Sequence, residues 1–223
     1  MITNHSMKKL ISIIFSAILI ANAFALDVKY IGEHKTEFHN HKYYTLELDT
    51  ETKNAAWIKW TLTNDEAIEA DAVDNRTNDF RKCGYPFTVS ATKQDYVNSG
   101  YDKGHGCPSN DMDFSKEAAS ATFYMCNMFP QTPNLNRGIW KKYEVYGHSL
   151  AKKYGQVEII CGPIYITNPK TIGNGVKVPD MFFKIFTVDD NSQVYVFTNT
   201  KDAQVRQISL EDLQKIVNIK IEK

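Results

Sequence analysis

A single long helical pattern set among strand-like segments is the feature that most limits the folds open to this chain. Apolar side chains recur every three or four positions from Ile139 to Tyr154, which is the spacing of one face of a helix. The same pattern points Lys141, Lys142 and His148 outward. A helix is therefore predicted here, with one side packed against the rest of the domain.

Segments on both sides of this helix have the composition of β-strands, because they are rich in aromatic and β-branched residues. They span residues 56–62, 122–128, 157–161, 182–188 and 193–198. Gly162-Pro163 is expected to end the third strand, and Ser209 is expected to begin a short C-terminal helix. The predicted fold class is α+β, with a mostly antiparallel central sheet and flanking helices.

The composition is that of a globular domain. The chain has 223 residues, of which 43% are apolar, and this is enough for one sizeable core. Its 26 basic and 26 acidic side chains balance, which argues against a protein that coats nucleic acid by bulk charge. A small local basic cleft remains compatible with that balance.

The N-terminus has the pattern of an export signal. A basic start precedes an apolar run over residues 10–21, and Ala23-Phe24-Ala25 follows. Signal peptidase reads small residues at that spacing, so residues 1–25 are expected to be removed, which leaves residues 26–223 as a single domain. The apolar run is too short to span a bilayer. The mature protein is expected to be secreted or periplasmic, without stable membrane association.

The chain has four cysteines, Cys83, Cys107, Cys126 and Cys161, and no Cys-x-x-Cys pair. The absence of such a pair argues against a structural zinc site, while an oxidising compartment would favour disulfides. Because Cys83 and Cys107 both lie in turn-rich segments, a bridge between them is expected. Cys126 and Cys161 are either buried thiols or a pair across strands.

Residues able to do chemistry concentrate around the start of the predicted helix. His105 lies in the glycine-flanked segment 100–106, amides follow in residues 127–131, and residues 134–144 add further amides, cations and a carboxylate. A helix N-terminus attracts phosphate through its free backbone N–H groups and the positive end of its dipole. The cluster therefore predicts a site that handles phosphate.

Short motifs in these segments occur in a fixed order. The first is Asp102-Lys103-Gly104-His105, and the second is Asn127-Met128-Phe129-Pro130-Gln131. Residues 135–140, Leu-Asn-Arg-Gly-Ile-Trp, and then Glu144 follow. With this order the chain resembles the DNA/RNA non-specific endonucleases, a ββα-metal group that includes mitochondrial endonuclease G and secreted bacterial nucleases. The resemblance covers roughly residues 40–200, and it implies a ββα-metal active-site motif.

The resemblance implies a hydrolase that cuts phosphodiester bonds with one divalent metal ion. His105 matches the family's general base, an imidazole that can take a proton from the attacking water. Asn136 matches the metal ligand, and its hard, neutral amide oxygen suits Mg²⁺ or Mn²⁺. Glu144 lies eight residues later, roughly on the same side of the helix, and would hold metal-bound water.

Further site residues follow from the same resemblance. Asn127 is expected to position the reacting groups, Arg76 and Lys103 to contact the substrate phosphate, and Gln131 to lie in the same cleft. Arg81 is the neighbouring alternative to Arg76. The family usually carries arginine in place of Lys103, and lysine keeps the charge without the planar fork that grips two phosphate oxygens.

Competing interpretations concern one motif and the function itself. His39-Asn40-His41 resembles a His-Asn-His nuclease motif, but it precedes a strand-like run and lacks later partners, so it is not assigned to catalysis.

The expected partners are DNA and RNA substrates, and relatives are often homodimers. The alternatives to an endonuclease are a catalytically silent nucleic-acid-binding relative and a phosphodiesterase acting on a smaller substrate.

Overall fold

The computed structural model describes residues 25–84, 89–166 and 168–222. The predicted export signal lies outside these described residues, except for Ala25. No helix in the described part of the chain is both long and apolar enough to cross a membrane.

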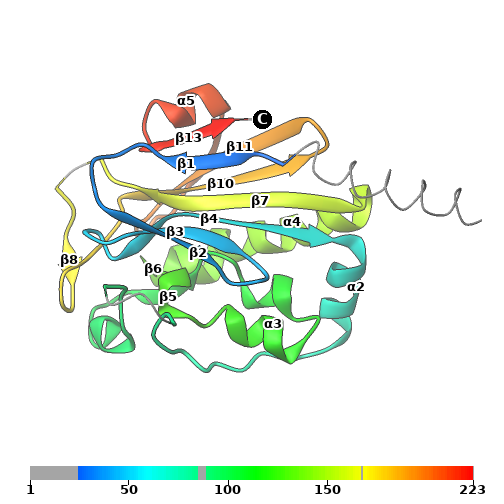
Figure 1. The fold of residues 1–223 in the computed structure, drawn as a ribbon, viewed down its shortest axis with the longest axis horizontal. Coiled ribbons are helices and arrows are strands. Elements are labelled where there is room, and N and C mark those ends of the chain that lie inside the picture. Colours follow the sequence, from blue (N-terminus) through cyan, green and yellow to red (C-terminus); the bar gives the residue numbers. More distant parts are fainter. Residues whose placement is uncertain (1–24, 85–88, 167, 223) are drawn as a thin grey trace, which may run out of the picture.

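A seven-stranded antiparallel sheet forms the centre of the fold (Figure 1). In sheet order its strands are β12 (Val205–Ile208), β11 (Asn191–Thr198), β10 (Met181–Val188), β7 (Gln156–Ile164), β4 (Asn54–Thr63), β3 (Thr45–Asp49) and β2 (Thr36–Asn40). The middle strands β10, β7 and β4 are largely buried, because the sheet is covered on both faces. The predicted α+β class with a mostly antiparallel sheet is confirmed.

Smaller elements surround the sheet. The α-helices are α2 (Asn64–Ala72), α3 (Lys116–Ala121), α4 (Lys141–Tyr154) and α5 (Leu210–Gln214). Short helical turns are η1 (Lys93–Tyr96), η2 (Ser109–Met112), η3 (Met125–Asn127) and the π-helical η4 (Leu135–Trp140). Two-stranded ribbons pair β1 (Asp27–Tyr30) with β13 (Ile219–Glu222), β5 (Asp102–His105) with β6 (Met128–Gln131), and β8 (Thr171–Ile172) with β9 (Val176–Lys177).

Alternating side chains of the central strands enter two cores on opposite faces of the sheet. On β10, Phe182 and Phe186 pack in the cluster that contains Leu150 of α4. Phe183 and Ile185 pack instead in the cluster that includes residues of β1, β13 and α5. This is the period-two alternation of a strand. Figure 1 shows α5, β1 and β13 on one side of the sheet and α2, α3 and α4 on the other.

Most of the predicted strands lie within strands of the sheet, but the prediction of a strand over residues 122–128 is wrong. α3 ends at Ala121 with Thr122 as its C-cap, η3 follows, and β6 begins only at Met128. The segment is apolar because nearly all of it is buried. A short apolar run is typical of any buried segment, so its periodicity does not distinguish a strand from a turn.

β7 continues past the stop that was predicted at Gly162-Pro163. A β-carbon on Gly162 would lie 2.5 Å from the backbone oxygen of Ala56, so glycine permits the close approach of β4. The pairing of β7 with β4 ends at Cys161, and Pro163 pairs only with Phe182 of β10. The missing N–H of proline therefore removes no hydrogen bond from the β4 side.

The predicted helix is present, although its start and one of its faces differ from expectation. α4 begins at Lys141, and η4 precedes it with a kink at Gly138 (φ −106°, ψ −106°). His148 was expected to face outward, but it is buried. There its Nε2 lies 3.1 Å from Asp111 Oδ1. The C-terminal helix begins as predicted after Ser209, whose side chain caps its N-terminus.

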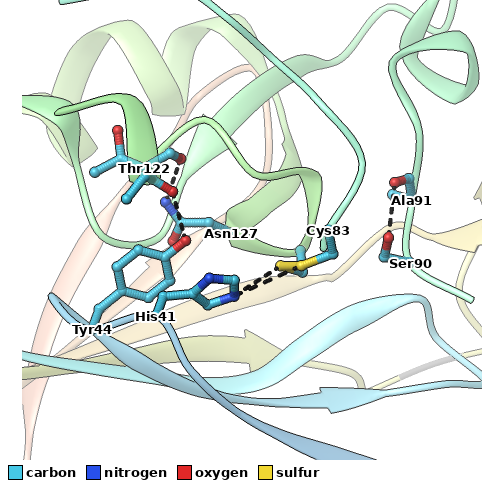
Figure 2. The surroundings of a disulfide bond; sticks show 9 residues. His41, Tyr44, Cys83, Ser90, Ala91, Thr122 and Asn127 are labelled. Atoms are coloured by element: carbon cyan, nitrogen blue, oxygen red, sulfur yellow. Dashed lines mark hydrogen bonds between the residues drawn. A yellow bond between two sulfur atoms is a disulfide. The ribbon is translucent and has the colours of Figure 1, made fainter. Parts of the chain in front are cut away.

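The structure contains a disulfide between Cys83 and Cys126 (Figure 2), so the predicted Cys83–Cys107 bridge is wrong. A backbone hydrogen bond from the Arg81 N–H to the Phe123 carbonyl holds the two chain segments side by side. The Cα atoms of the bridged cysteines are 5.6 Å apart, the usual separation for a disulfide. The other two cysteines are buried free thiols.

Candidate active site

The β5–β6 ribbon and the start of α4 form one structural unit. The two strands are antiparallel, and their register places His105 opposite Met128. The chain then passes through η4 into α4. The indole N–H of Trp140, the last residue of η4, donates to the backbone carbonyl of His105 at 3.0 Å. This hydrogen bond joins the ribbon to the helix, so the expected succession of two strands and a helix is present.

A cavity of about 760 Å³ opens beside this unit. Its lining includes His105, Asn136, Glu144, Arg76 and Lys103. The volume lies within the usual range for ligand pockets. Side chains from a loop, a strand, a π-helical turn and a helix therefore meet at one cavity, which we call the β5–α4 cavity.

His105 is held in a mostly aromatic environment. Its ring centroid lies 5.0 Å from that of Phe123, edge to face, and 5.9 Å from that of Phe80. His105 is 8% exposed, and its Nε2 has no hydrogen-bond partner among the described residues. Burial, with the charges of Arg76 and Lys103, lowers the pKa of His105 from 6.5 to about 3. The imidazole is therefore neutral at physiological pH and can accept a proton.

Asn136 is oriented by its neighbours. Its Nδ2 donates to Asp102 Oδ2 at 3.0 Å, and the same carboxylate accepts two hydrogen bonds from Arg137 at 2.8 and 2.7 Å. Although burial raises the pKa of Asp102, the hydrogen bonds from Arg137 and Asn136 lower it overall. An ionised Asp102 can only accept, so it engages the NH₂ group of Asn136 and leaves the amide oxygen for another partner.

Glu144 lies on α4, where its charge is poorly solvated. Burial raises the pKa of this carboxyl from 4.5 to about 7; Lys184 acts to lower it and Asp111 to raise it. Lys184 is itself fully buried, with its Nζ 4.0 Å from the centroid of the Trp140 ring. Glu144 is therefore poised to gain or lose its proton near neutral pH.

Two cations lie above the aromatic residues that surround His105. The Arg76 guanidinium is 5.1 Å from the centre of the Phe123 ring, and Lys103 Nζ is 4.9 Å from that of Phe80. Within the described part of the chain neither cation forms a salt bridge, so both charges can attract an anion in the cavity. Arg81, the alternative to Arg76, does not line the cavity and pairs with a neighbouring aspartate at 2.6 Å.

The remaining predicted residues, Asn127 and Gln131, are fully buried and do not line the cavity. Asn127 donates to the carbonyls of Cys107 and Thr122, both at 2.8 Å, and accepts from the Cys107 N–H at 2.9 Å. It therefore fixes the turn that follows His105. Gln131 is packed against β5, which leaves it no direct path to a substrate in the cavity.

The comparison with known families decides what kind of protein carries this cavity. A family model described as DNA/RNA non-specific endonuclease matches residues 24–222. The chain belongs to this family. The resemblance found in the sequence motifs is thereby confirmed.

Relatives of this endonuclease-family chain are nucleases by name. It is 33% identical over 168 residues to the mitochondrial Nuclease 1 of Schizosaccharomyces pombe, covering 69% of this chain and 52% of the relative. It is 32% identical over 158 residues to the mitochondrial Endonuclease G of Homo sapiens, covering 66% and 52%. The chain spans about half the length of these curated relatives. A chain in the crystal structure of an EndoG/EndoGI complex aligns with a TM-score of 0.73 and 26% identity, covering 85% of this chain and 86% of that one.

The predicted secreted or periplasmic location is contradicted by these comparisons. Nucleases from Schizosaccharomyces pombe, Saccharomyces cerevisiae and Homo sapiens that match this endonuclease-family chain are mitochondrial. A basic N-terminus is shared by export signals and mitochondrial presequences, so the positive charges could not separate the two destinations.

Two features of this site were missed in the sequence. The first is the aromatic environment of His105, formed by Phe80 and Phe123, which lie outside the motif that contains the histidine. The second is Lys184, whose charge acts on Glu144. A signal for the lysine was present, because it interrupts an otherwise apolar strand, and a buried charge requires a partner.

Proposed function

We propose that this chain is an endonuclease that hydrolyses phosphodiester bonds of DNA and RNA with little sequence preference. The observation that carries the proposal is the β5–α4 cavity. There the unpartnered Nε2 of buried His105 and the oriented amide of Asn136 share one cavity with the cations Arg76 and Lys103. A base, an oxygen donor and phosphate-binding charges are the parts that phosphodiester hydrolysis requires.

The donors at the cavity fit a hard divalent cation. Asp102 engages the NH₂ group of Asn136, so the amide oxygen is available as a ligand, and Glu144 adds a carboxylate that can hold water beside it. Oxygen donors of this kind suit Mg²⁺ or Mn²⁺. When bound, such an ion would stabilise negative charge on the phosphate and on the departing oxygen.

His105 would act as the general base. Its pKa is lowered to about 3 by burial and by the nearby charges of Arg76 and Lys103. A substrate phosphate would neutralise part of the field of Arg76 and Lys103, and a nearby negative charge raises the pKa of an imidazole. The ring is thus kept free of a proton until substrate binds, and its basicity then increases as it takes a proton from the attacking water.

Arg76 and Lys103 would bind the substrate through phosphate. Phosphate contacts position a nucleic acid without reading its bases, which accounts for low sequence preference and for the use of both polymers. Asn127 would support this chemistry indirectly, because its hydrogen bonds hold the turn after His105. A homodimer remains a prediction that the single chain does not test.

The test is a cleavage assay with supercoiled plasmid and with RNA, in Mg²⁺ and in excess chelator. Both polymers should be cut only when the metal is present. His105→Ala should lower the rate by about 10²–10⁴-fold, the usual contribution of a general base. His34→Ala is the matched control, since His34 lies outside the cavity and pairs with Asp49, and it should cut at the wild-type rate.

Other results would contradict the proposal in distinguishable ways. Undiminished cutting by His105→Ala would remove the histidine from the mechanism. Binding of both polymers without cutting would identify a catalytically silent relative. Hydrolysis of a small phosphodiester such as bis(p-nitrophenyl) phosphate, with both polymers left intact, would favour an enzyme for smaller substrates.

A further inference from the structure

A second cluster of potential metal ligands surrounds the disulfide, away from the β5–α4 cavity. His39 lies in β2 and His41 follows that strand; residues two apart on extended chain share a face. Their rings stack with centroids 5.0 Å apart. Figure 2 shows the His41 ring pointing at the disulfide, with its Nε2 3.8 Å from Cys83 Sγ and 3.6 Å from Cys126 Sγ.

The spacing of these atoms is close to that of a tetrahedral zinc site. Zinc–sulfur and zinc–nitrogen bonds of about 2.3 and 2.0–2.1 Å imply about 3.5 Å between a nitrogen and a sulfur ligand. The His41 separations are near this value. The ligand atoms of His39, His41 and Cys83 all lie within 4.8 Å of one another, so small side-chain rotations would bring them onto one ion.

The chemistry of the cluster also suits zinc. His39, Cys83 and Cys126 are buried, which excludes competing water. Burial lowers the pKa of both histidines to about 4, so at neutral pH they are in the unprotonated form that binds metal. Two thiolates would cancel the charge of a divalent ion, and sulfur with imidazole nitrogen is the donor set that zinc prefers.

We propose that reduction of the Cys83–Cys126 disulfide creates a zinc site formed by Cys83, Cys126, His39 and His41. A dithiol reductant supplies two electrons and two protons, the S–S bond breaks, and the reductant becomes a disulfide. Zinc then replaces the two thiol protons. In the oxidised chain the sulfurs are bonded to each other and cannot ligate as thiolates, so disulfide and zinc exclude one another.

The chain has no Cys-x-x-Cys pair, and this zinc site does not need one. Its ligands come from three segments that are distant along the chain, around residues 39–41, at Cys83 and at Cys126. None of the four residues lines the β5–α4 cavity. The site is therefore separate from the proposed catalytic centre, and the His-x-His pair that had no role in catalysis gains one here.

Cobalt(II) is the probe that distinguishes this site from a site with oxygen ligands. The whole chain is reduced with a dithiol, freed of reductant without oxygen and titrated with Co²⁺. Thiolate-to-cobalt absorption should saturate at one ion per chain, together with the visible bands of tetrahedral cobalt, and equimolar Zn²⁺ should abolish both. The oxidised chain should show neither signal.

Matched variants assign the ligands. His41→Asn and His39→Asn should each weaken Co²⁺ and Zn²⁺ binding by more than about 100-fold, beyond the 10–100-fold cost of losing an outer partner. Cys126→Ser should abolish the two-thiolate spectrum. His34→Asn and Cys107→Ala, which alter the same residue types elsewhere, should bind as the wild type does. A double variant, His105→Ala with Asn136→Ala, should also keep the signal, which separates it from the catalytic metal.

A second readout uses only the wild type, so it does not depend on how well the variants fold. Zn²⁺ should raise the thermal unfolding midpoint of the reduced wild type by more than it raises that of the oxidised wild type. The proposal is overturned if reduced wild-type chain gives no thiolate–cobalt absorption, if the oxidised chain binds equally well, or if a folded His41→Asn variant binds with wild-type affinity.

Discussion

The Oδ2 atom of Asp102 accepts a hydrogen bond of 3.0 Å from the side-chain amide of Asn136. The first residue of β5 thereby sets the orientation of a cavity-lining residue in η4. Arg137 binds the same carboxylate through two further hydrogen bonds. Asp102 is thus a positioning residue, because it determines which end of the Asn136 amide is free to meet a cation.

Removing this carboxylate should weaken metal binding. Asp102→Ala is expected to lower Mn²⁺ affinity by about 10–100-fold, the usual effect of losing an outer hydrogen-bond partner. The measurement is Mn²⁺ binding to the chain without nucleic acid. Arg137→Ala is the matched control: it also breaks the Asp102–Arg137 pair, but it keeps the bond to Asn136 and should retain most of the affinity. Equal losses in both variants would contradict the orienting role.

Replacing Lys103 should weaken substrate binding through charge. Lys103→Gln is expected to raise the half-saturating DNA concentration and to reduce the slope of log affinity against log salt by about one. Lys103→Arg keeps the charge and adds a planar fork, so it should retain the slope. Lys152→Gln serves as control, because Lys152 lies outside the cavity and pairs with Asp71. A salt slope unchanged in Lys103→Gln would remove this lysine from the phosphate contacts.

Glu144 should titrate near neutrality in the metal-free chain. Its pKa is raised to about 7, so the carboxylate form is present above pH 7 and is lost as the pH falls through 7. Carboxyl-carbon NMR should therefore show a midpoint near 7, and Mn²⁺ affinity should fall between about pH 8 and pH 6.

Lys184 provides the control for that titration. Its charge lowers the pKa of Glu144, so Lys184→Met should move the midpoint to higher pH. Glu144→Gln identifies the resonance, because only the Glu144 signal disappears. The interpretation fails if Glu144 titrates near 4.5, or if a folded Lys184→Met variant leaves the midpoint where it was.

The disulfide should stabilise the fold. It closes a loop with a sequence separation of 43, so reduction in the presence of chelator is expected to lower the free energy of unfolding by about 2–4 kcal/mol. Urea unfolding with and without reductant measures this. Cys107→Ala should keep the response to reductant, whereas Cys83→Ala should lose it. An identical response in both variants would mean that the reductant acts elsewhere.

Much of the site was predictable because its residues lie in short segments on either side of one helix start. Residues 102–105 carry the histidine and residues 135–144 carry Asn136 and Glu144, and these residues do line one cavity. Asn127 and Gln131 belong to the motif of residues 127–131, yet both are buried away from this cavity. A motif shows which residues lie near a site. Successive side chains of an extended segment point to opposite faces, however, so residues of one motif can face either the cavity or the core.

The sequence by itself determined the family, the α+β class and five of the residues that line the β5–α4 cavity, because these depend on local order and composition. Only the tertiary structure decided that Cys83 pairs with Cys126, that residues 122–128 form turns, and that the charge of Lys184 acts on Glu144. Each of these depends on segments that are distant in sequence and are brought together by packing on the sheet. Local patterns of hydrophobicity and turn residues do not encode which distant segments meet.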